Sequence, residues 1–227
     1  MSPLTVVFDL DGTLIDTAPD LIDTLNVIMA REGMQPVDCA QARSLIGGGA
    51  RRMIEAGLKS ERRVESAGTI DRMFADFLVH YSEHIADRSR PFPGLVDALD
   101  RLASDGCRLA VCTNKLEGLS RQLLAALDLT DRFAAICGQD TFGVQKPNPE
   151  VLRQTVQAAG GILERAIMVG DSITDIATAK AAGIPVVAVD FGYSEEPIQT
   201  LGADRLIGRF DELPAAIGDL AMSWAAR

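Results

Sequence analysis

The stretch LTVVFDLDGT, residues 4–13, places two carboxylates where an apolar run ends. The residues before Asp9 are apolar on both faces of an extended chain, which is typical of a strand buried inside a parallel sheet. Open parallel sheets bind their ligands beyond the carboxyl ends of the strands. Asp9 and Asp11 therefore lie where we expect a functional site, and Gly12 lets the chain turn away directly after them.

The chain beyond about residue 91 predicts the rest of the same sheet. Further strands are predicted by the apolar runs at 107–112, 134–137, 165–170 and 184–190. Helical patterns lie between these runs, for example over residues 116–129 and 148–160. We therefore predict an α/β fold with a doubly wound, Rossmann-like core, whose parallel sheet is covered by helices on both faces.

Residues 15 to 88 break this alternation. Leu21, Leu25 and Ile28 recur at helical spacing, further helical patterns follow, and no strand is expected. The further patterns lie at about 38–46, 50–59 and 65–85. The sequence thus predicts a small helical cap domain inserted after the first strand. The boundaries that follow are 15–88 for the cap, and 1–14 with 89–227 for the catalytic core.

The start of the predicted cap carries a helix N-terminus signal. Thr17 offers a hydroxyl for the N-cap, Pro19 lies in the first turn, and Asp20 follows three residues after the cap. Linkers are expected near residues 13–17 and 87–93, and prolines and a glycine punctuate the second. Together these linkers predict a hinge between the cap and the core.

The charge balance restricts the classes of molecule that the protein could bind. Lys plus Arg is 22 and Asp plus Glu is 32, a net charge of −10 that argues against general nucleic-acid binding. A small anionic substrate would need local positive charge from a metal ion, a lysine or backbone N–H groups. No apolar run approaches the roughly 18 residues of a membrane span, and the first residues show no signal-peptide pattern. We expect no membrane partner, a cytoplasmic location, and a monomer or a homodimer.

The cysteines and histidines predict no second metal site. Cys39, Cys107, Cys112 and Cys137 are scattered and fit no metal-ligand spacing, so we expect small buried side chains in a reducing compartment. His80 and His84 have the i, i+4 spacing that can hold a metal on a helix. A third ligand is not evident near them, so plain helix residues are the favoured interpretation.

Polar side chains follow several of the predicted strands. Thr113-Asn114-Lys115 follows the strand at 108–112, and Gly170-Asp171-Ser172 follows the strand at 166–169, with Asp175 three residues later. Gln145-Lys146-Pro147 precedes the helix at 148–160. Because the carboxyl ends of parallel strands share one edge of a sheet, all these groups are expected to lie near Asp9 and Asp11.

The types of these side chains suit phosphoryl chemistry with a metal ion. Mg²⁺ takes one or two carboxylates plus substrate phosphate, and Asp9 and Asp171 could provide that pair. Asp9 could also attack phosphorus, because aspartate carboxylates form phosphoryl-enzyme intermediates. The metal would screen the repulsion between the two anions.

The remaining groups could hold the phosphoryl oxygens and move a proton. Lys146, Thr113 and Asn114 would neutralise and bind the equatorial oxygens, where charge accumulates. Asp11 could protonate the leaving alkoxide and then accept a proton from the water that hydrolyses the intermediate.

Each feature alone also has a purely structural interpretation. The D-x-D pair could be a solvated turn, and Thr113-Asn114 could cap the next helix. Lys146 could be solvated in an ordinary loop. Asp171 and Asp175 could be cap and first-turn acids of the following helix. Independent structural roles do not predict four such features at one sheet edge, so a common site is favoured.

These residues resemble the four motifs of the haloacid dehalogenase-like phosphohydrolases, in order and over essentially the whole chain. The motifs are DLDGT at 9–13, Thr113, Lys146 and GDSITD at 170–175. The resemblance implies Asp9 as nucleophile and Asp11 as general acid and base. It also implies Mg²⁺ held by the Asp9 side chain, the Asp11 carbonyl and Asp171.

The same resemblance implies supporting roles for the neighbouring residues. Thr113, Asn114 and Lys146 would bind the phosphoryl group. The supporting residues would be Gly12, Ser172 and Asp175. Dehalogenases of the superfamily lack the second aspartate of the first motif, so the presence of Asp11 favours phosphoryl chemistry.

Within the superfamily, the chain is most similar to the bacterial phosphoglycolate phosphatases. The stretches that carry this similarity are LIDTAPDL (14–21), IGGGARRMIEAGL (46–58), VCTNK (111–115), KPNPEVL (146–152) and LGADRLI (201–207). It implies Mg²⁺-dependent hydrolysis of 2-phosphoglycolate, a small phosphorylated metabolite. Hydrolysis of a sugar phosphate and a β-phosphoglucomutase-like transfer stay open. A phosphonate hydrolase would need a Schiff-base lysine in the cap. Lys59 is the cap lysine, and it lies in a polar stretch, which argues against this activity. A non-catalytic binding protein would not need the intact motifs, so their presence argues against that alternative.

The cap must select the substrate, because the core motifs contact only phosphate and metal. Gly47-Gly48-Gly49 precedes Arg51 and Arg52 at the start of a predicted helix. Such a loop could offer N–H groups and an arginine to the glycolate carboxylate. The alternative is a flexible turn with two solvated arginines.

Overall fold

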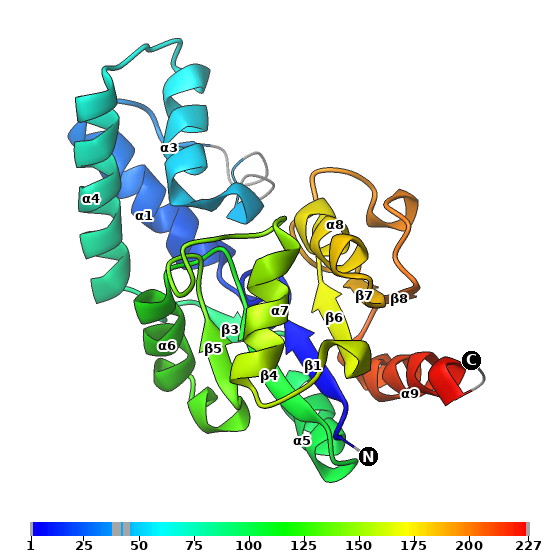
Figure 1. Ribbon diagram of the computed structural model, residues 1–227. Coiled ribbons are helices and arrows are strands. Elements are labelled where there is room, and N and C mark those ends of the chain that lie inside the picture. The colour runs from blue at the N-terminus through cyan, green and yellow to red at the C-terminus, as the bar shows by residue number, and fades with distance from the viewer. Residues whose placement is uncertain (1, 38–41, 43–45, 226–227) are drawn as a thin grey trace.

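The computed structural model describes residues 2–37, 42 and 46–225 and contains a six-stranded sheet at its centre (Figure 1). Its strands are β1 (Thr5–Phe8), β4 (Arg108–Cys112), β5 (Ala135–Cys137), β6 (Ala166–Gly170), β7 (Val186–Val189) and β8 (Arg205–Ile207). They are all parallel, in the order β5-β4-β1-β6-β7-β8. This is the doubly wound arrangement, and the strand order reverses between β1 and β6. The predicted core is confirmed.

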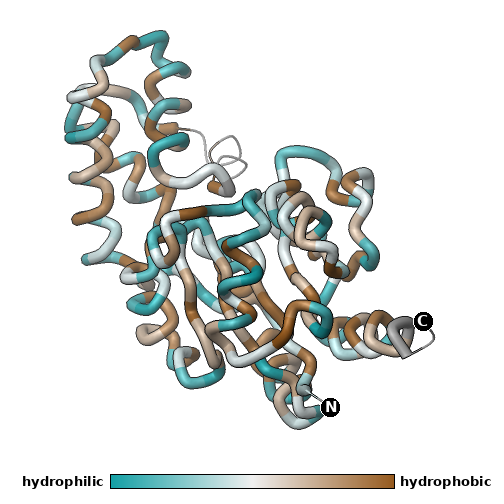
Figure 2. The backbone as a smooth tube through the Cα atoms, in the orientation of Figure 1, coloured by the Kyte–Doolittle hydropathy of each residue, from teal (hydrophilic) through white to brown (hydrophobic). Residues whose placement is uncertain are grey.

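Helices cover both faces of this sheet. One face packs against α5 (Leu95–Ser104), α6 (Glu117–Ala126) and α9 (Leu213–Ala225), and the other against α7 (Pro149–Ala158) and α8 (Ile173–Ala182). In β1, Val6 and Phe8 face the first set and Val7 faces the second, and all three side chains are fully buried. Hydrophobic residues accordingly follow the central strands, while the outer turns are hydrophilic (Figure 2). Burial on both faces explains why these strands have continuous apolar sequences.

Three helices lie apart from the sheet, next to the carboxyl ends of its strands (Figure 1). They are α1 (Ala18–Arg31), α3 (Gly49–Ser60), which follows the short 3₁₀ turn Ile46–Gly48, and α4 (Ala67–Glu83). They pack on one another through buried side chains such as Ile28, Met53 and Phe77. The helices expected at 50–59 and 65–85 are therefore present. The pattern at 38–46 lies mostly outside the described residues.

The two connections between these helices and the sheet pair with each other. β2 (Ile15–Asp16) runs antiparallel to β3 (Arg90–Pro91). The expectation that residues 15–88 contain no strand is thus wrong at β2. A two-residue strand is too short to show periodicity, and it forms only because the two connections run side by side.

The start of α1 also differs from the prediction. Thr17 occupies the N-cap position, but its side chain makes no capping bond, and its buried hydroxyl has no partner in the structure. The Asp20 carboxylate instead accepts hydrogen bonds from the backbone N–H groups of Arg88 (2.9 Å) and Ser89 (2.7 Å). It also accepts one from the Ser89 hydroxyl, at 2.6 Å. This carboxylate fixes the start of α1 to the segment that returns to the sheet, so it does not cap the helix.

The remaining sequence expectations concern membranes, cysteines and histidines. In the part of the chain that the structure describes, no helix has both the length and the apolar character needed to span a membrane. Cys112 and Cys137 are buried free thiols, Cys107 is half-buried, and Cys39 lies outside the described residues. His80 stacks on His84 with ring centroids 4.4 Å apart. Among the described residues, the cluster that could hold a metal consists of Asp9, Asp171 and Asp175.

Candidate active site

Three carboxylates meet where the strand order reverses. Asp9 follows β1, Asp171 follows β6, and Asp175 lies in the first turn of α8. An oxygen of each carboxylate lies within 4.8 Å of an oxygen of the other two. Neighbouring parallel strands carry Asp9 and Asp171, so the register of β1 and β6 brings the two side chains together.

Asp171 is held from two sides. The Thr13 hydroxyl donates to Asp171 Oδ1 at 3.0 Å, and the Tyr193 backbone N–H donates to Oδ2 at 2.6 Å. Each oxygen keeps a lone pair, because a carboxylate oxygen accepts about two hydrogen bonds. Burial, reinforced by the charges of Asp175 and Asp9, raises the pKa of Asp171 to about 8. The site therefore has a surplus of negative charge that a cation would relieve.

Lys146 lies between two of the acids. Its Nζ is 2.6 Å from Asp175 Oδ1 and 2.9 Å from Asp9 Oδ1. The contact with Asp9 lacks the alignment of a hydrogen bond, so Asp9 Oδ1 is buried without a hydrogen-bond partner. Burial lowers the pKa of Lys146, but Asp175 and Asp9 more than offset this and raise it above its ordinary value. Lys146 is therefore a fixed cation beside Asp9.

The cluster fits a divalent metal ion. Of the three carboxylates, Asp9 and Asp175 contact Lys146 and Asp171 does not. Among the described residues Asp9 Oδ1 has no hydrogen-bond partner, and both Asp171 oxygens keep lone pairs. Hard oxygen donors of this kind suit Mg²⁺, which needs only one or two protein carboxylates. Asp9 and Asp171 are the two that remain available, since Asp175 is occupied by Lys146 and Ser172.

Ser172 and Asp175 form a reciprocal capping box at the start of α8. The Ser172 hydroxyl accepts from the Asp175 N–H at 3.3 Å, and the Asp175 carboxylate accepts from the Ser172 N–H at 3.1 Å. Asp175 thus combines the two interpretations of the sequence: it begins the helix and holds Lys146.

Asn114 holds the backbone of Lys146. Its amide accepts from the Lys146 N–H at 2.9 Å and donates to the Lys146 carbonyl at 3.1 Å. The residue also lines the cavity, so its predicted contact with a phosphoryl oxygen stays a prediction. We assign Asn114 to the positioning of Lys146. Thr113 is buried and lines the cavity described below.

Gly12 makes the close approach of the acidic loops possible. Its φ is +82°, and a Cβ there would overlap the Asp171 carboxylate and the Tyr193 ring. We expect Gly12→Ala to lower the free energy of unfolding by about 1–3 kcal/mol for the backbone alone, with a further loss from the overlap. Urea denaturation measures both.

Gly143→Ala is a matched control, because Gly143 has a φ of +71° and open space around its Cβ position. An equal loss in the two variants would show that the overlap with Asp171 has no consequence.

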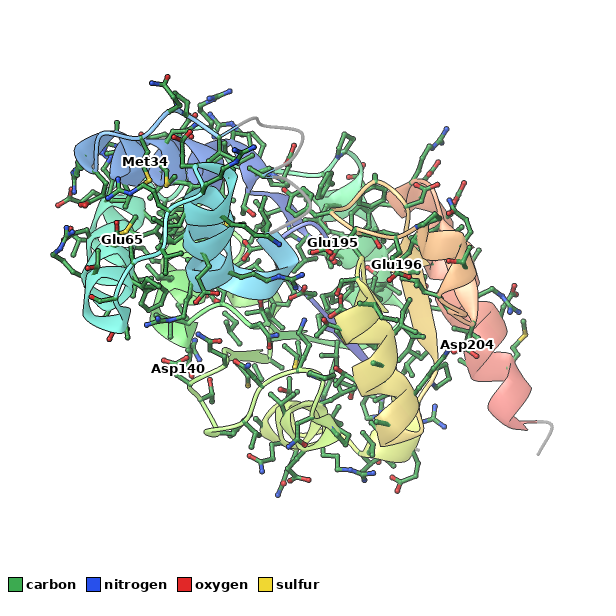
Figure 3. The ribbon with its side chains drawn as sticks, turned by 90° about the horizontal axis from the view of Figure 1, so that it is seen from above. Met34, Glu65, Asp140, Glu195, Glu196 and Asp204 are labelled. Atoms are coloured by element: carbon green, nitrogen blue, oxygen red, sulfur yellow. The ribbon has the colours of Figure 1, made fainter. Side chains whose placement is uncertain are left out.

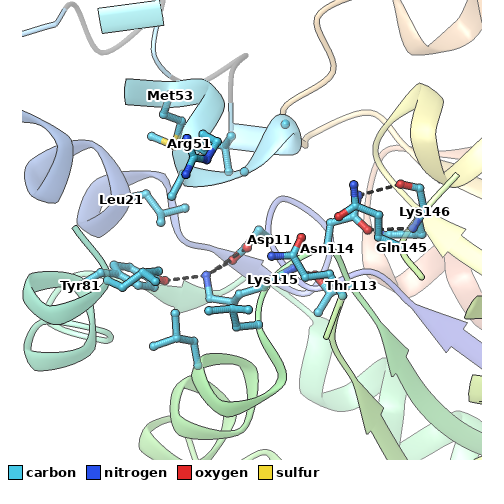
Figure 4. Close-up of a pocket in the computed structure, with 18 of the residues that line it drawn as sticks. Asp11, Leu21, Arg51, Met53, Tyr81, Thr113, Asn114, Lys115, Gln145 and Lys146 are labelled. Carbon is cyan, nitrogen blue, oxygen red and sulfur yellow. Dashed lines mark hydrogen bonds and ion pairs between the residues drawn. The ribbon is translucent and has the colours of Figure 1, made fainter. Parts of the chain in front are cut away.

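Asp11 contacts a lysine that the sequence analysis did not assign. Lys115 Nζ donates to Asp11 Oδ1 at 3.0 Å and Oδ2 at 3.1 Å, and to the Tyr81 hydroxyl at 2.9 Å (Figure 4). Lys115 follows β4, so its place at the sheet edge was visible in the sequence. Tyr81 comes from α4, and no sequence signal connects it to the site.

A cavity of about 410 Å³ lies over these groups, between the sheet and the three outer helices. Its wall on the side of the helices is mostly apolar, from Leu21, Ile46, Met53, Phe74, Phe77 and Leu78. On the side of the sheet it is polar, from Asp9, Asp11, Thr113, Asn114, Lys115, Gln145, Lys146 and Ser172. A ligand there would meet charge on one side and a water-excluding surface on the other.

The two cap arginines are placed differently. Arg51 lines the cavity, but its guanidinium pairs with Asp71 and lies over the Phe74 ring, 5.3 Å from its centroid. Arg52 does not belong to the lining, and its guanidinium is 3.0 Å from Glu195. Glu195 lies on the side of the core that faces α3 (Figure 3). Arg52 thus connects α3 with the loop after β7.

Comparisons with known proteins identify the family. The family model described as haloacid dehalogenase-like hydrolase matches residues 6–189. A protein of Mesorhizobium japonicum named phosphoglycolate phosphatase is 49% identical over 96% of each chain. One of the same name from Caulobacter vibrioides is 43% identical over 98% of this chain and 94% of its own.

A solved structure has the same fold over nearly the whole chain. It is described as a predicted phosphoglycolate phosphatase from Haemophilus somnus 129pt, with a TM-score of 0.88 and 25% identity over 95% of this chain and 98% of its own. The family match covers both acidic motifs and both strands beside the reversal. This chain belongs to the haloacid dehalogenase-like hydrolase family.

Proposed function

We propose that this protein is a Mg²⁺-dependent phosphatase that hydrolyses 2-phosphoglycolate through an aspartyl-phosphate on Asp9. The observation that carries the proposal is the position of Asp9 between Lys146 and Asp171, with Asp11 on the cavity side of the same loop. The names of the relatives support phosphatase activity and suggest the substrate.

The chain's own residues account for each chemical step. Asp9 attacks phosphorus, and Lys146 and Thr113 stabilise the charge on the equatorial oxygens. Asp11 protonates the departing alkoxide and then takes a proton from the water that attacks the phosphoryl-enzyme. Mg²⁺, held by Asp9, the Asp11 carbonyl and Asp171, would polarise the phosphoryl group and screen the anions.

Residues 15–88 act in this proposal as a cap that excludes water while the intermediate forms. The apolar wall from α1, α3 and α4 supplies the exclusion, and the paired connections β2 and β3 supply the attachment. The Arg52–Glu195 pair joins the cap to the core on the far side from that attachment.

The apolar wall favours a small leaving group over a sugar with several hydroxyls. A volume of about 410 Å³ would also admit a sugar phosphate, which keeps that substrate class as the second candidate. Sugar hydroxyls against Leu21, Met53 and Phe77 would lose hydrogen bonds to water without replacement, at a cost in affinity.

A substrate panel tests the function. Phosphate release is measured from 2-phosphoglycolate, β-glucose 1-phosphate and several sugar phosphates, with Mg²⁺ and with a chelator. We expect the highest kcat/KM for 2-phosphoglycolate and none with chelator. Preference for a sugar phosphate would reject the substrate and keep the reaction, whereas formation of a sugar-phosphate isomer would identify a mutase.

The metal requirement has a pH signature. Without metal, folded Asp171 holds a proton that the unfolded chain has released, because its pKa is raised from 3.8 to about 8. Stability with chelator should therefore fall as pH rises between these values. Mg²⁺ binds the deprotonated carboxylate, so the stability that Mg²⁺ adds to the folded protein should increase over the same pH range. At a Mg²⁺ concentration 100 times Kd, the added free energy of unfolding should reach roughly 2.7 kcal/mol.

Thermal unfolding with and without Mg²⁺ across this pH range measures the added stability, and Asp171→Asn should lose it. A Mg²⁺ effect of the same size in that variant would contradict the assignment.

A further inference from the structure

We infer that Lys115 and Tyr81 together form the subsite for the substrate's carboxylate. The inference rests on the proposed function and goes beyond it, because it names the residues that distinguish an anionic leaving group from a neutral one. The subsite joins the core to the cap, since Lys115 follows β4 and Tyr81 belongs to α4.

Among the described residues, the cations that line the cavity are Arg51, Lys115 and Lys146. Each is paired with an acid, so burial and position decide between them, and both favour Lys115. Lys146 is occupied by Asp9 and Asp175 beside the phosphoryl position. The Arg51 side chain is 45% exposed and paired with Asp71. The Lys115 side chain is 5% exposed, so its charge acts where water is largely excluded.

Hydrogen-bond arithmetic shows that the pair can still bind an anion. An ammonium has three N–H donors, and Lys115 Nζ faces three acceptor atoms, the two Asp11 carboxylate oxygens and the Tyr81 hydroxyl oxygen. The pair therefore offers an incoming carboxylate the charge of Lys115 and the hydroxyl proton of Tyr81. The Tyr81 oxygen accepts from Lys115, so its own proton is left to donate. Burial raises the pKa of Tyr81 to about 12 against the effect of Lys115, which keeps that proton in place.

The position of the pair matches the length of the substrate. Asp11 is the proposed donor to the ester oxygen, and Lys115 is in direct contact with Asp11. In 2-phosphoglycolate a single methylene separates the ester oxygen from the carboxylate. The carboxylate of a substrate whose ester oxygen lies at Asp11 therefore reaches the Lys115–Tyr81 pair. Leu21 lies above this pair (Figure 4) and shields it from water.

Tyr81→Phe is the sharpest test, because it removes one oxygen from a fully buried ring and leaves Lys115 and Asp11 in place. We measure kcat/KM for 2-phosphoglycolate and for ethylene glycol monophosphate, which has a neutral hydroxymethyl group in place of the carboxylate. Loss of a hydrogen bond to a charged group predicts a decrease of about 10- to 100-fold for 2-phosphoglycolate, mainly in KM. The neutral ester should change by less than about threefold.

A second readout does not depend on turnover. The inhibition constant of the product glycolate should rise in Tyr81→Phe by a factor similar to that for KM. Lys115→Met should reduce turnover of both esters, because Asp11 also loses its partner, with the larger decrease for 2-phosphoglycolate. Lys59→Met, at an exposed cap lysine, is the control and should match the wild type.

The outcomes separate the inference from the function. If wild-type preference for 2-phosphoglycolate over the neutral ester persists in Tyr81→Phe, or if both esters slow equally, the inference is wrong and the proposed function stands. If the wild type shows no such preference, the proposed substrate fails, and the inference fails with it.

Discussion

Asp9→Asn should abolish phosphate release, with kcat reduced roughly 10⁴-fold or more, the scale expected when a covalent nucleophile is lost. The amide has the shape of the carboxylate but cannot attack phosphorus. It also removes one negative charge from a cluster of three acids, two of which contact Lys146. The variant should therefore fold at least as stably as the wild type, because burial already raises the pKa of Asp9 to about 6.

Steady-state phosphate release and thermal unfolding of the same preparation separate the two effects. Activity within tenfold of the wild type would show that Asp9 is not the nucleophile. A loss of activity accompanied by unfolding would instead show that the carboxylate is needed for the fold.

Lys146→Met should destabilise the protein by about 3–5 kcal/mol, in addition to removing activity. The side chain is buried and neutralises Asp175 and Asp9 at once. Without it, the buried carboxylates of the site face one another with no fixed cation. Urea denaturation in the presence of chelator measures the loss without a contribution from metal binding.

A double variant tests the cause of this loss. Asp175→Asn in the Lys146→Met background should recover part of the stability, because it removes a charge that has lost its partner. Lys180→Met is the control: Lys180 is an exposed lysine on α8 that donates to the Leu201 carbonyl. A loss below about 1 kcal/mol for Lys146→Met would mean that the charges are not coupled as described.

The fold was predictable wherever burial determines sequence. Strands covered on both faces need continuous apolar runs, and β1, β4, β5, β6 and β7 show them. β8 was not predicted, because in this edge strand Arg205 and Leu206 are exposed and only Ile207 is buried. β2 was missed for a different reason, since its pairing with β3 depends on a chain segment about 75 residues away.

The site was predictable to the extent that it lies at the strand ends. Asp9, Asp171 and Lys146 came together because parallel strands present their carboxyl ends at one edge. Tyr193, whose N–H holds Asp171, follows β7 at the same edge, and its position after a predicted strand is a signal that could have found it. Lys115 also followed a predicted strand, but only the folded structure brings its ammonium to Asp11.

Contacts that cross from the cap to the core could not be predicted. Tyr81 and Arg52 occupy ordinary helical positions, and their partners depend on how the cap docks. The partners of Asp20 could not be predicted either. Its sequence position favours helix capping, but its carboxylate accepts hydrogen bonds from Arg88 and Ser89. Under the proposed function, these crossing contacts select the substrate, so the sequence predicts the reaction more readily than the substrate.

The stereochemistry of phosphoryl transfer tests the central claim most directly. The substrate is 2-phosphoglycolate made isotopically chiral at phosphorus, and the configuration of the released phosphate is determined after hydrolysis with Mg²⁺. Transfer first to Asp9 and then to water consists of two in-line displacements, so the account predicts overall retention. Inversion would show a single direct attack by water and would contradict the aspartyl-phosphate on Asp9.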